Sequence, residues 1–367
     1  MAQNPNYFAI LVGISRYADS NLHPLDGPVR DVHLMEDWLV LENGGNVPPA
    51  NVKTIISDES SQVAATDGEM PPVFLDFFNA FLRLVRKPDK SGYIRRASSR
   101  LYLYFSGHGF CEKRKREAHA ALYVANADRD VNWNIYGTYF AQWTKDQGLF
   151  DEIVLIMDCC RDAELAKQPL EPPLRRPTDI GIASNAKLFE LYAAPRGGKA
   201  QERPIPSRNN EVHGLLTHAF LDALEHADPG KPVVSTSEIK KYLEERWSAL
   251  CGTEPADPPE VVVPSNGEIL FRRATALGLP QRFKLNRLNV GDSFEIIDAS
   301  LSVVAQVTLL AGEAQVIWPF RAMTTPCTID NGIFIVPLPA TYYMIVAATS
   351  GGMLRRKFQA GDGDVEL

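Results

Sequence analysis

The chain has 367 residues, of which 45% are hydrophobic and 23% charged, and its formal net charge is −7. This length suggests two domains, and the composition is that of a globular protein with a substantial core. The negative charge argues against nucleic acid as a partner, because phosphate binding needs a clustered positive surface. The five cysteines have no regular spacing of the kind that indicates a disulfide framework.

The N-terminal stretch MAQNPNYFAILVGISRY lacks the basic region and the small-residue cleavage site of a signal peptide. No apolar run in the sequence approaches the roughly 18 residues that a membrane-spanning helix needs. We therefore expect a soluble, cytoplasmic protein without a membrane partner. In that reducing compartment an exposed thiol can stay reactive.

Strands and helices are expected to alternate along the first three quarters of the chain. Continuous apolar runs predict strands at 7–14, 52–57, 100–106, 152–158 and 186–194. Apolar residues at helical spacing predict helices at 26–42, 71–87, 214–227 and 236–250. This alternation predicts an α/β fold in which helices cover both faces of a mostly parallel sheet.

The last part of the chain has a different pattern. After about residue 275, β-rich segments are separated by Gly, Pro and Asn, and no helical stretch follows. We expect a small all-β, sandwich-like module there, and hence two domains, 1–274 and 275–367. The segment 161–213 is rich in prolines and basic residues, and it is either a functional loop or a solvated insertion.

A histidine and a cysteine follow two of the predicted strands. The strand at 100–106 runs into Gly107-His108-Gly109, and the strand at 152–158 runs into Cys159-Cys160. Open parallel sheets carry their sites at the carboxyl ends of strands. A thiol must become a thiolate to attack a carbonyl carbon, and a nearby imidazole promotes that step. The alternative is that the histidine is structural and the cysteine a small buried hydrophobe.

Four segments in order resemble the successive blocks of prokaryotic caspase-like and metacaspase-like peptidases, between residues 7 and 250: FAILVGISRYADSNLHPLDGPVRDVHLMEDWL, LYLYFSGHGF, IVLIMDCCRD and GLLTHAFLDAL. The histidine also lies about 50 residues upstream of the cysteine, a spacing known from caspases. The resemblance implies a caspase-like fold and a cysteine endopeptidase that acts on proteins. The sequence contains no CxxC pair, HExxH motif or Gly-rich phosphate loop, so we expect no cofactor or metal. The resemblance also implies regulation by another protein, within a bacterial stress or antiviral defence pathway.

The resemblance assigns the base to His108 and the nucleophile to Cys160, the third residue of an Asp-x-Cys turn. It implies an oxyanion hole built from the backbone N–H groups of Gly109 and Cys160. Cys159 stands beside the nucleophile, and we expect it to be a packed neighbour. Only separate mutation of the two cysteines decides between them.

Two acids are candidates for the pocket that receives the substrate residue before the cleaved bond, called P1. Asp158 precedes the nucleophile by two positions, and Asp31 resembles the second acid of a metacaspase-like pocket. A pair of carboxylates would favour Arg over Lys, because a guanidinium can bind them bidentately. The alternative for Asp31 is that it only stabilises the start of a helix.

If the enzyme cuts after basic residues, it could cleave itself within 161–213. The candidate positions are Arg175, Arg176, Lys199, Arg203 and Arg208. A further basic run, Lys113 to Arg116, is a solvated loop or an inhibitory or cleavable segment. The competing function is a catalytically silent caspase-like scaffold that binds a protein partner through its β module.

Overall fold

The structure is a computed structural model. It describes residues 3–57, 70–72, 74–112, 119–128, 131–164, 169–175, 185–208, 210–228, 233–252, 254–272, 279–285, 288–298, 303–318, 323–330, 332–338, 342–349, 352–359 and 364–366. The chain divides into two compact units. One comprises Met1–Pro204 with Val212–Ala274, and the other comprises Ile205–Glu211 with Thr275–Leu367.

A six-stranded sheet forms the centre of the first unit, in the order β13-β9-β7-β3-β1-β2. Its strands are β1 (Tyr7–Ile14), β2 (Val52–Ser57), β3 (Arg100–Gly107), β7 (Glu152–Cys159), β9 (Lys187–Tyr192) and β13 (Glu260–Val262). The first five run parallel to one another, and β13 is antiparallel to β9. Because β1, β3 and β7 have neighbours on both sides and helices above and below, their sequences are almost wholly apolar.

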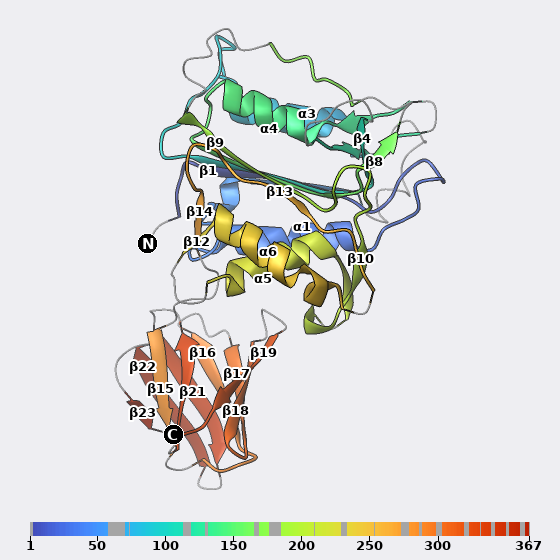
Figure 1. Cartoon of the computed structure of the whole chain (residues 1–367). Coiled ribbons are helices and arrows are strands. Elements are labelled where there is room, and N and C mark those ends of the chain that lie inside the picture. Colours follow the sequence, from blue (N-terminus) through green and yellow to red (C-terminus); the bar gives the residue numbers. More distant parts are fainter. Residues whose placement is uncertain are drawn as a thin grey trace. The chain divides into compact units, whose positions relative to one another are not determined.

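Helices cover both faces of this sheet, as Figure 1 shows. One face carries α3 (Phe74–Val85) and α4 (Gly137–Asp146), and the other carries α1 (Gly27–Val40), α5 (Leu215–His226) and α6 (Thr236–Cys251). Strand side chains alternate between two separate cores, so Leu155 and Met157 face α3 and α4, whereas Val154 and Ile156 lie on the opposite face. This arrangement confirms the predicted α/β class.

Several short elements are absent from the sequence-based prediction. The strands β4 (Gly109–Glu112), β5 (Ala121–Tyr123), β6 (Asn134–Ile135) and β8 (Asp162–Glu164) form a small sheet in the order β6-β5-β4-β8. The strands β10 (Glu202–Ile205) and β11 (Glu211–Gly214) pair, as do β12 (Val233–Ser235) and β14 (Leu270–Arg272), and two short 3-10 helices span Pro49–Asn51 and Pro206–Arg208. Strands of two to four residues are too short to show a periodicity.

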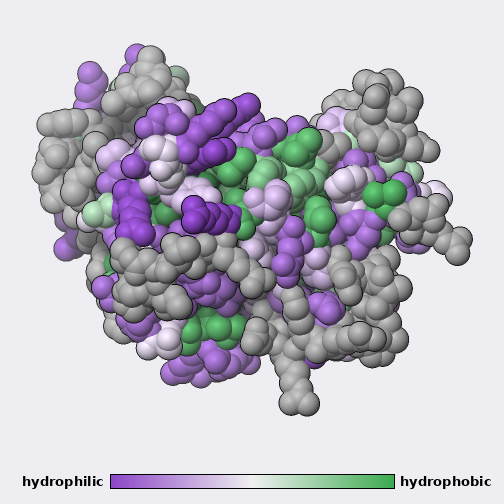
Figure 2. Space-filling model, turned by 90° about the horizontal axis from the view of Figure 1, so that it is seen from above, coloured by the Kyte–Doolittle hydropathy of each residue, from purple (hydrophilic) through white to green (hydrophobic). Residues whose placement is uncertain are grey.

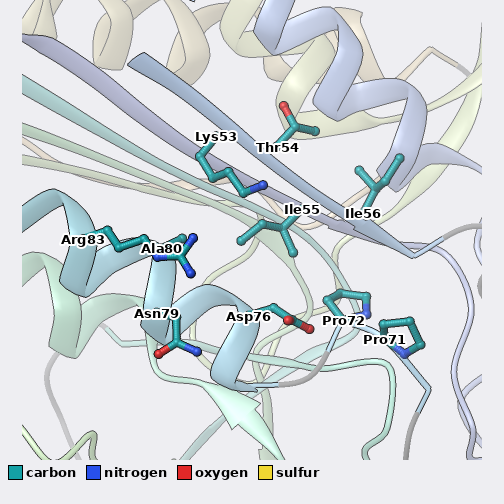
Figure 3. Close-up of a pocket in the computed structure, with 10 residues that line it drawn as sticks. All are labelled: Lys53, Thr54, Ile55, Ile56, Pro71, Pro72, Asp76, Asn79, Ala80 and Arg83. Carbon is teal, nitrogen blue, oxygen red and sulfur yellow. The ribbon is translucent and has the colours of Figure 1, made fainter. Parts of the chain in front are cut away.

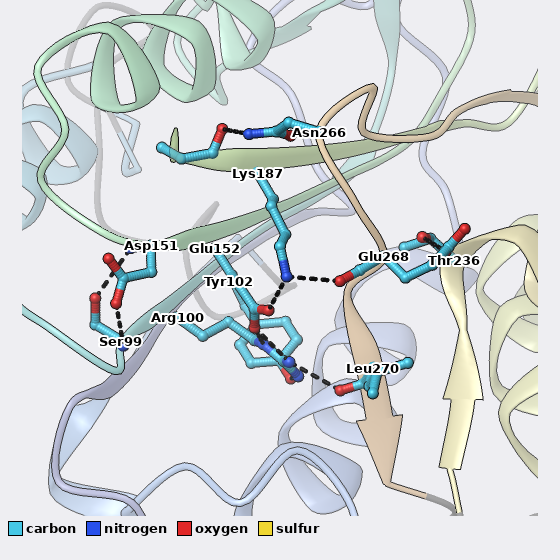
Figure 4. Close-up of polar contacts among 11 residues, drawn as sticks. Ser99, Arg100, Tyr102, Asp151, Glu152, Lys187, Thr236, Asn266, Glu268 and Leu270 are labelled. Carbon is cyan, nitrogen blue, oxygen red and sulfur yellow. Dashed lines mark hydrogen bonds and ion pairs between the residues drawn. The ribbon is translucent and has the colours of Figure 1, made fainter. Parts of the chain in front are cut away.

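A polar network holds the amino ends of the central strands together (Figure 4). The guanidinium of Arg100 on β3 lies 2.6 Å from Glu152 on β7 and donates to the carbonyl of Leu270. Lys187 on β9 forms an ion pair with the same Glu152 at 3.4 Å and donates to the carbonyl of Glu268. These contacts join β3, β7 and β9 to β14 and to the segment before it, at the end of the sheet away from the predicted site.

The face of the molecule above α3 and α4 in Figure 1 is seen in Figure 2. Apolar residues gather near the middle of this face, and hydrophilic residues predominate around them. Within the described parts of the chain, none of the helices combines the length and the apolar character that crossing a membrane requires.

The second unit is built of β-strands, which confirms the all-β class predicted for the C-terminal module. One sheet has the order β19-β18-β17-β16-β21-β22 and another the order β20-β15-β23. The strands are β15 (Leu279–Lys284), β16 (Ser293–Asp298), β17 (Val303–Leu310), β18 (Glu313–Trp318), β19 (Met323–Thr328), β20 (Ile333–Leu338), β21 (Tyr342–Thr349), β22 (Gly352–Gln359) and β23 (Asp364–Glu366). Phe283, Phe294 and Phe334 pack in its core.

Candidate active site

His108 and Cys160 follow directly on neighbouring parallel strands. In the register of β3 and β7, Ser106 lies opposite Asp158 and Gly107 lies opposite Cys159, so His108 and Cys160 are the next residues of the two chains. Both line one pocket of about 110 Å³. The pocket is therefore at the carboxyl ends of the strands, where an open parallel sheet places its site.

The glycines on either side of His108 are required for two different reasons. Gly107 has a φ of +147°, which favours glycine, and a side chain there would also overlap the hydroxyl of Tyr17. At Gly109 a Cβ would lie 2.5 Å from Cys159 Sγ and 2.8 Å from the carbonyl oxygen of Ala121. The first glycine turns the chain, and the second lets β4 pass close to β7.

Backbone groups and Tyr17 orient the His108 ring. The His108 N–H donates to the Tyr17 hydroxyl at 2.7 Å, and the two rings lie 5.1 Å apart. The ring Nε2 is 2.8 Å from the carbonyl oxygen of His23, which can only accept, so Nε2 carries the hydrogen in this contact. Nδ1 is then the nitrogen that can take up a proton, and the carbonyl of His23 serves as the orienting third group.

The two adjacent cysteines point to opposite faces of the sheet. Cys159 is fully buried among the residues that face α3 and α4, where burial, followed by the charge of Cys160, raises the pKa of its thiol well above the usual value. Cys160 is half-buried, lines the pocket and has its Sγ 3.7 Å from the carbonyl oxygen of Ala200. A buried thiol that keeps its proton is a poor nucleophile.

Both acids singled out in the sequence lie in this pocket. Asp31 is on the buried side of α1, where Oδ1 lies 2.8 Å from His213 Nδ1 and Oδ2 accepts a hydrogen bond from the Gly214 N–H. Asp158 Oδ2 accepts hydrogen bonds from the N–H and the hydroxyl of Thr217, in the first turn of α5. Burial and then the charge of Asp31 raise the pKa of Asp158 to about 7.

Because Gly214 has no side chain, it leaves room for the carboxylates of Asp31 and Asp158. A Cβ at this position would overlap Asp158 Oδ2 and lie 2.8 Å from Asp31 Oδ2. The two oxygens are therefore close neighbours across the Gly214 backbone. The sequence-based analysis did not single out this glycine, although it stands directly before a strongly periodic helix.

A third carboxylate in the pocket was also missed. Glu202, on β10, lines the pocket and accepts hydrogen bonds from the N–H groups of Asp26 and Gly27 at the start of α1. A Cβ at Gly27 would lie 3.0 Å from Glu202 Oε2 and 3.2 Å from Asp31 Oδ2, so these two acids also converge. No motif signals Glu202, because it comes from the basic, proline-rich segment 161–213.

Arg161, the residue after Cys160, is fully buried and anchors the turn. Its side chain donates to the carbonyl oxygens of His119 and Ala194 at 3.1 and 3.0 Å, and it lies over the Tyr192 ring at 4.5 Å. It also forms an ion pair with Glu260 of β13. Through these bonds the turn that carries Cys160 is tied to the edge of the sheet.

We compared the chain with known proteins. No family model matches it. A curated protein from a Desulfuromonadales bacterium, named a probable protease, is 26% identical over 255 residues, which are 66% of this chain and 28% of that protein. The crystal structure of caspase-1 from Spodoptera frugiperda aligns over 72% of this chain and 88% of that one, with 12% identity and a TM-score of 0.42. This chain resembles the caspase-like peptidases.

The chain spans little more than a quarter of the length of the curated protease, so it corresponds to one part of that protein. The resemblance is the one that the four ordered sequence motifs predict. It concerns the kind of protein and assigns no role to individual residues.

The basic residues considered for self-cleavage of this caspase-like chain differ in their surroundings. Arg175 and Lys199 are exposed and Arg208 is half-buried, whereas Arg176 and the run Lys113–Arg116 lie outside the described residues. The guanidinium of Arg203 is bound to Gln201 and to the carbonyl oxygens of Cys251 and Glu254.

A second pocket, of about 350 Å³, lies between β2 and α3 (Figure 3). It is lined by Lys53, Thr54, Ile55, Ile56, Pro71, Pro72, Asp76, Asn79, Ala80 and Arg83. Among these described residues there is neither a cysteine nor a histidine. His108 and Cys160 line the other pocket, at the carboxyl ends of the strands.

Proposed function

We propose that this chain is a cysteine endopeptidase that cleaves proteins after basic residues and prefers Arg to Lys. The observation that carries this proposal is the convergence of His108, Cys160 and three carboxylates on one pocket. The name of the curated relative supports a peptidase. The acids support a cationic P1 side chain, because a charge buried in such a pocket needs a partner of opposite sign.

In the proposed reaction His108 takes the proton from the Cys160 thiol, and the thiolate attacks the carbonyl carbon of the substrate. The N–H groups of Gly109 and Cys160 would stabilise the oxyanion that forms. His108 then gives the proton to the leaving amine, which leaves an acyl-enzyme on Cys160. Water, activated by the same imidazole, hydrolyses this thioester and restores the thiol.

The three acids fit arginine better than lysine. Asp31 and Asp158 approach each other across Gly214, and Glu202 approaches Asp31 across Gly27. A guanidinium presents five N–H groups in a planar fork and can bind two carboxylates at once, whereas an ammonium is a compact point charge. The negative charges of these acids repel one another, and the positive charge of a basic P1 residue would offset this repulsion.

An activity-based label tests this proposal. A peptide with a thiol-reactive ketone and Arg at P1 should modify Cys160, as located by mass spectrometry, and the same reagent with Asp at P1 should not. Labelling should be lost in Cys160→Ala and in His108→Ala but kept in Cys159→Ser. Labelling that ignores the P1 residue and survives His108→Ala would instead favour the silent scaffold.

A further inference from the structure

His213 is a buried residue that contacts Asp31 of the acidic pocket and has no role in the proposed reaction. It lies on β11, and its side chain is 2% exposed. Its Nδ1 is 2.8 Å from Asp31 Oδ1. A carboxylate oxygen accepts, so Nδ1 carries the hydrogen and donates it in this bond.

The contact fixes Asp31 from one side. His213 binds Oδ1 and the next residue, Gly214, donates its N–H to Oδ2, also at 2.8 Å. Two donors from consecutive residues therefore set both the position and the plane of the Asp31 carboxylate. Asp31 also lines the pocket, so the carboxylate held in this way faces the space where a ligand would bind.

The orientation of the Asp31 carboxylate matters for a substrate with Arg at P1 but not for one with Lys. Bidentate binding of a guanidinium needs a carboxylate whose plane is fixed, because two parallel hydrogen bonds must form together. A lysine ammonium has no such requirement, since it binds as a point charge. A donor that fixes the plane of Asp31 therefore favours Arg more than Lys.

We propose that His213 is a positioning residue that orients Asp31 for a guanidinium and so sets the preference for Arg over Lys. This inference rests on the proposed function and adds the residue that determines its specificity. The imidazole acts through Asp31 and does not take part in bond cleavage. Replacing it should change recognition of the P1 side chain and leave the reactivity of Cys160 as it is.

Two substitutions separate positioning from packing. His213→Asn keeps an N–H donor where Nδ1 stands but fills less space, whereas His213→Phe fills the space but has no donor. We expect His213→Phe to raise KM for an Arg peptide about tenfold or more, with little change in kcat and a smaller effect on the matched Lys peptide. His213→Asn should keep the selectivity of the parent protein. His226→Ala, on the exposed side of α5, is the matched control.

The opposite pattern, with selectivity kept in His213→Phe and lost in folded His213→Asn, would show a packing role and overturn the inference. If His213→Phe does not fold, the Asn variant alone decides, and its loss of selectivity is the contradicting result. Calorimetric binding of agmatine and of n-pentylamine to Cys160→Ala protein gives a readout independent of cleavage. If Cys160→Ala protein binds agmatine but the parent protein has no peptidase activity, only the proposed function is contradicted. A preference for agmatine that is unchanged when His213→Phe is added to Cys160→Ala would contradict the role of His213. No binding of agmatine to Cys160→Ala would instead contradict the basic P1 pocket of the proposed function.

Discussion

Asp158 has two properties that oppose each other. Thr217 donates two hydrogen bonds to its carboxylate, which favours the ionised form, but burial and the nearby Asp31 favour the protonated form and raise the pKa to about 7. In the empty pocket the side chain therefore loses its proton only as the pH rises through neutrality. A cationic ligand binds the ionised form, so ligand binding should release this proton.

This predicts a pH dependence of binding. Affinity of the Cys160→Ala protein for agmatine should rise by up to about tenfold per pH unit below pH 7 and level off above it. Asp158→Asn should weaken binding and flatten the pH profile, because no proton is left to displace. Calorimetry between pH 5.5 and 8.5 measures both. An affinity of the parent protein that does not change over this range would contradict the assignment.

The family pattern left the choice between the two cysteines open, and the alternation of side chains along the strand is a sequence signal that favours Cys160. Side chains alternate along a strand, so Cys159 shares a face with Leu155 and Met157, and Cys160 shares the other with Asp158. The alternation places the nucleophile and the acid on the same side of the sheet. The strands and the His108–Cys160 neighbourhood could also be predicted, because they depend on apolar runs and strand ends.

Other parts of the site could not be predicted from the sequence. Glu202, His213 and Arg161 act through contacts with residues far away along the chain, and only the fold brings those partners together. Neither periodicity nor a short motif encodes such pairs.

At the scale of elements, the junction of β11 and α5 shapes the pocket. A Cβ at Gly214 would overlap the Asp158 carboxylate, so Gly214→Ala should displace one or both acids. We expect cleavage after Arg to fall at least about tenfold, because a charge-assisted contact is lost. Alkylation of Cys160 by iodoacetamide, which needs no acid pocket, should be unchanged. Unaltered cleavage by this variant would mean that the two acids do not bind the substrate.

The turn after β7 depends on the buried side chain of Arg161. Arg161→Ala removes its bonds to two carbonyl oxygens and to Glu260, and we expect the free energy of unfolding to fall by about 3 kcal/mol. Arg161→Lys keeps the positive charge but lacks the planar guanidinium, so its loss of stability should be intermediate. Urea denaturation measures this order, and equal stability of all three proteins would contradict the anchoring role.

At the scale of the whole molecule, self-cleavage would be confined by the fold. The segment Ala200–Glu202 lines the pocket, so a cut after Lys199 would sever its wall, and Arg203 is bound to backbone carbonyls. Arg208 is half-buried, whereas Arg175 is exposed, although its carbonyl oxygen accepts hydrogen bonds from the side chains of Trp143 and Gln147. We therefore expect processing at Arg175 or Arg176. The double variant Arg175→Ala, Arg176→Ala should stay intact on a gel, while Arg203→Ala is processed like the parent chain. Processing that persists in the double variant but is absent from Arg203→Ala would contradict this placement.

We propose that one pocket contains both a Cys160–His108 catalytic dyad and the acids that select a basic P1 residue. A peptide library in which only the P1 residue varies tests both halves of this claim in one measurement. We expect cleavage after Arg, weaker cleavage after Lys, and no cleavage by Cys160→Ala. A preference for Asp at P1, or cleavage that persists in Cys160→Ala, would contradict it.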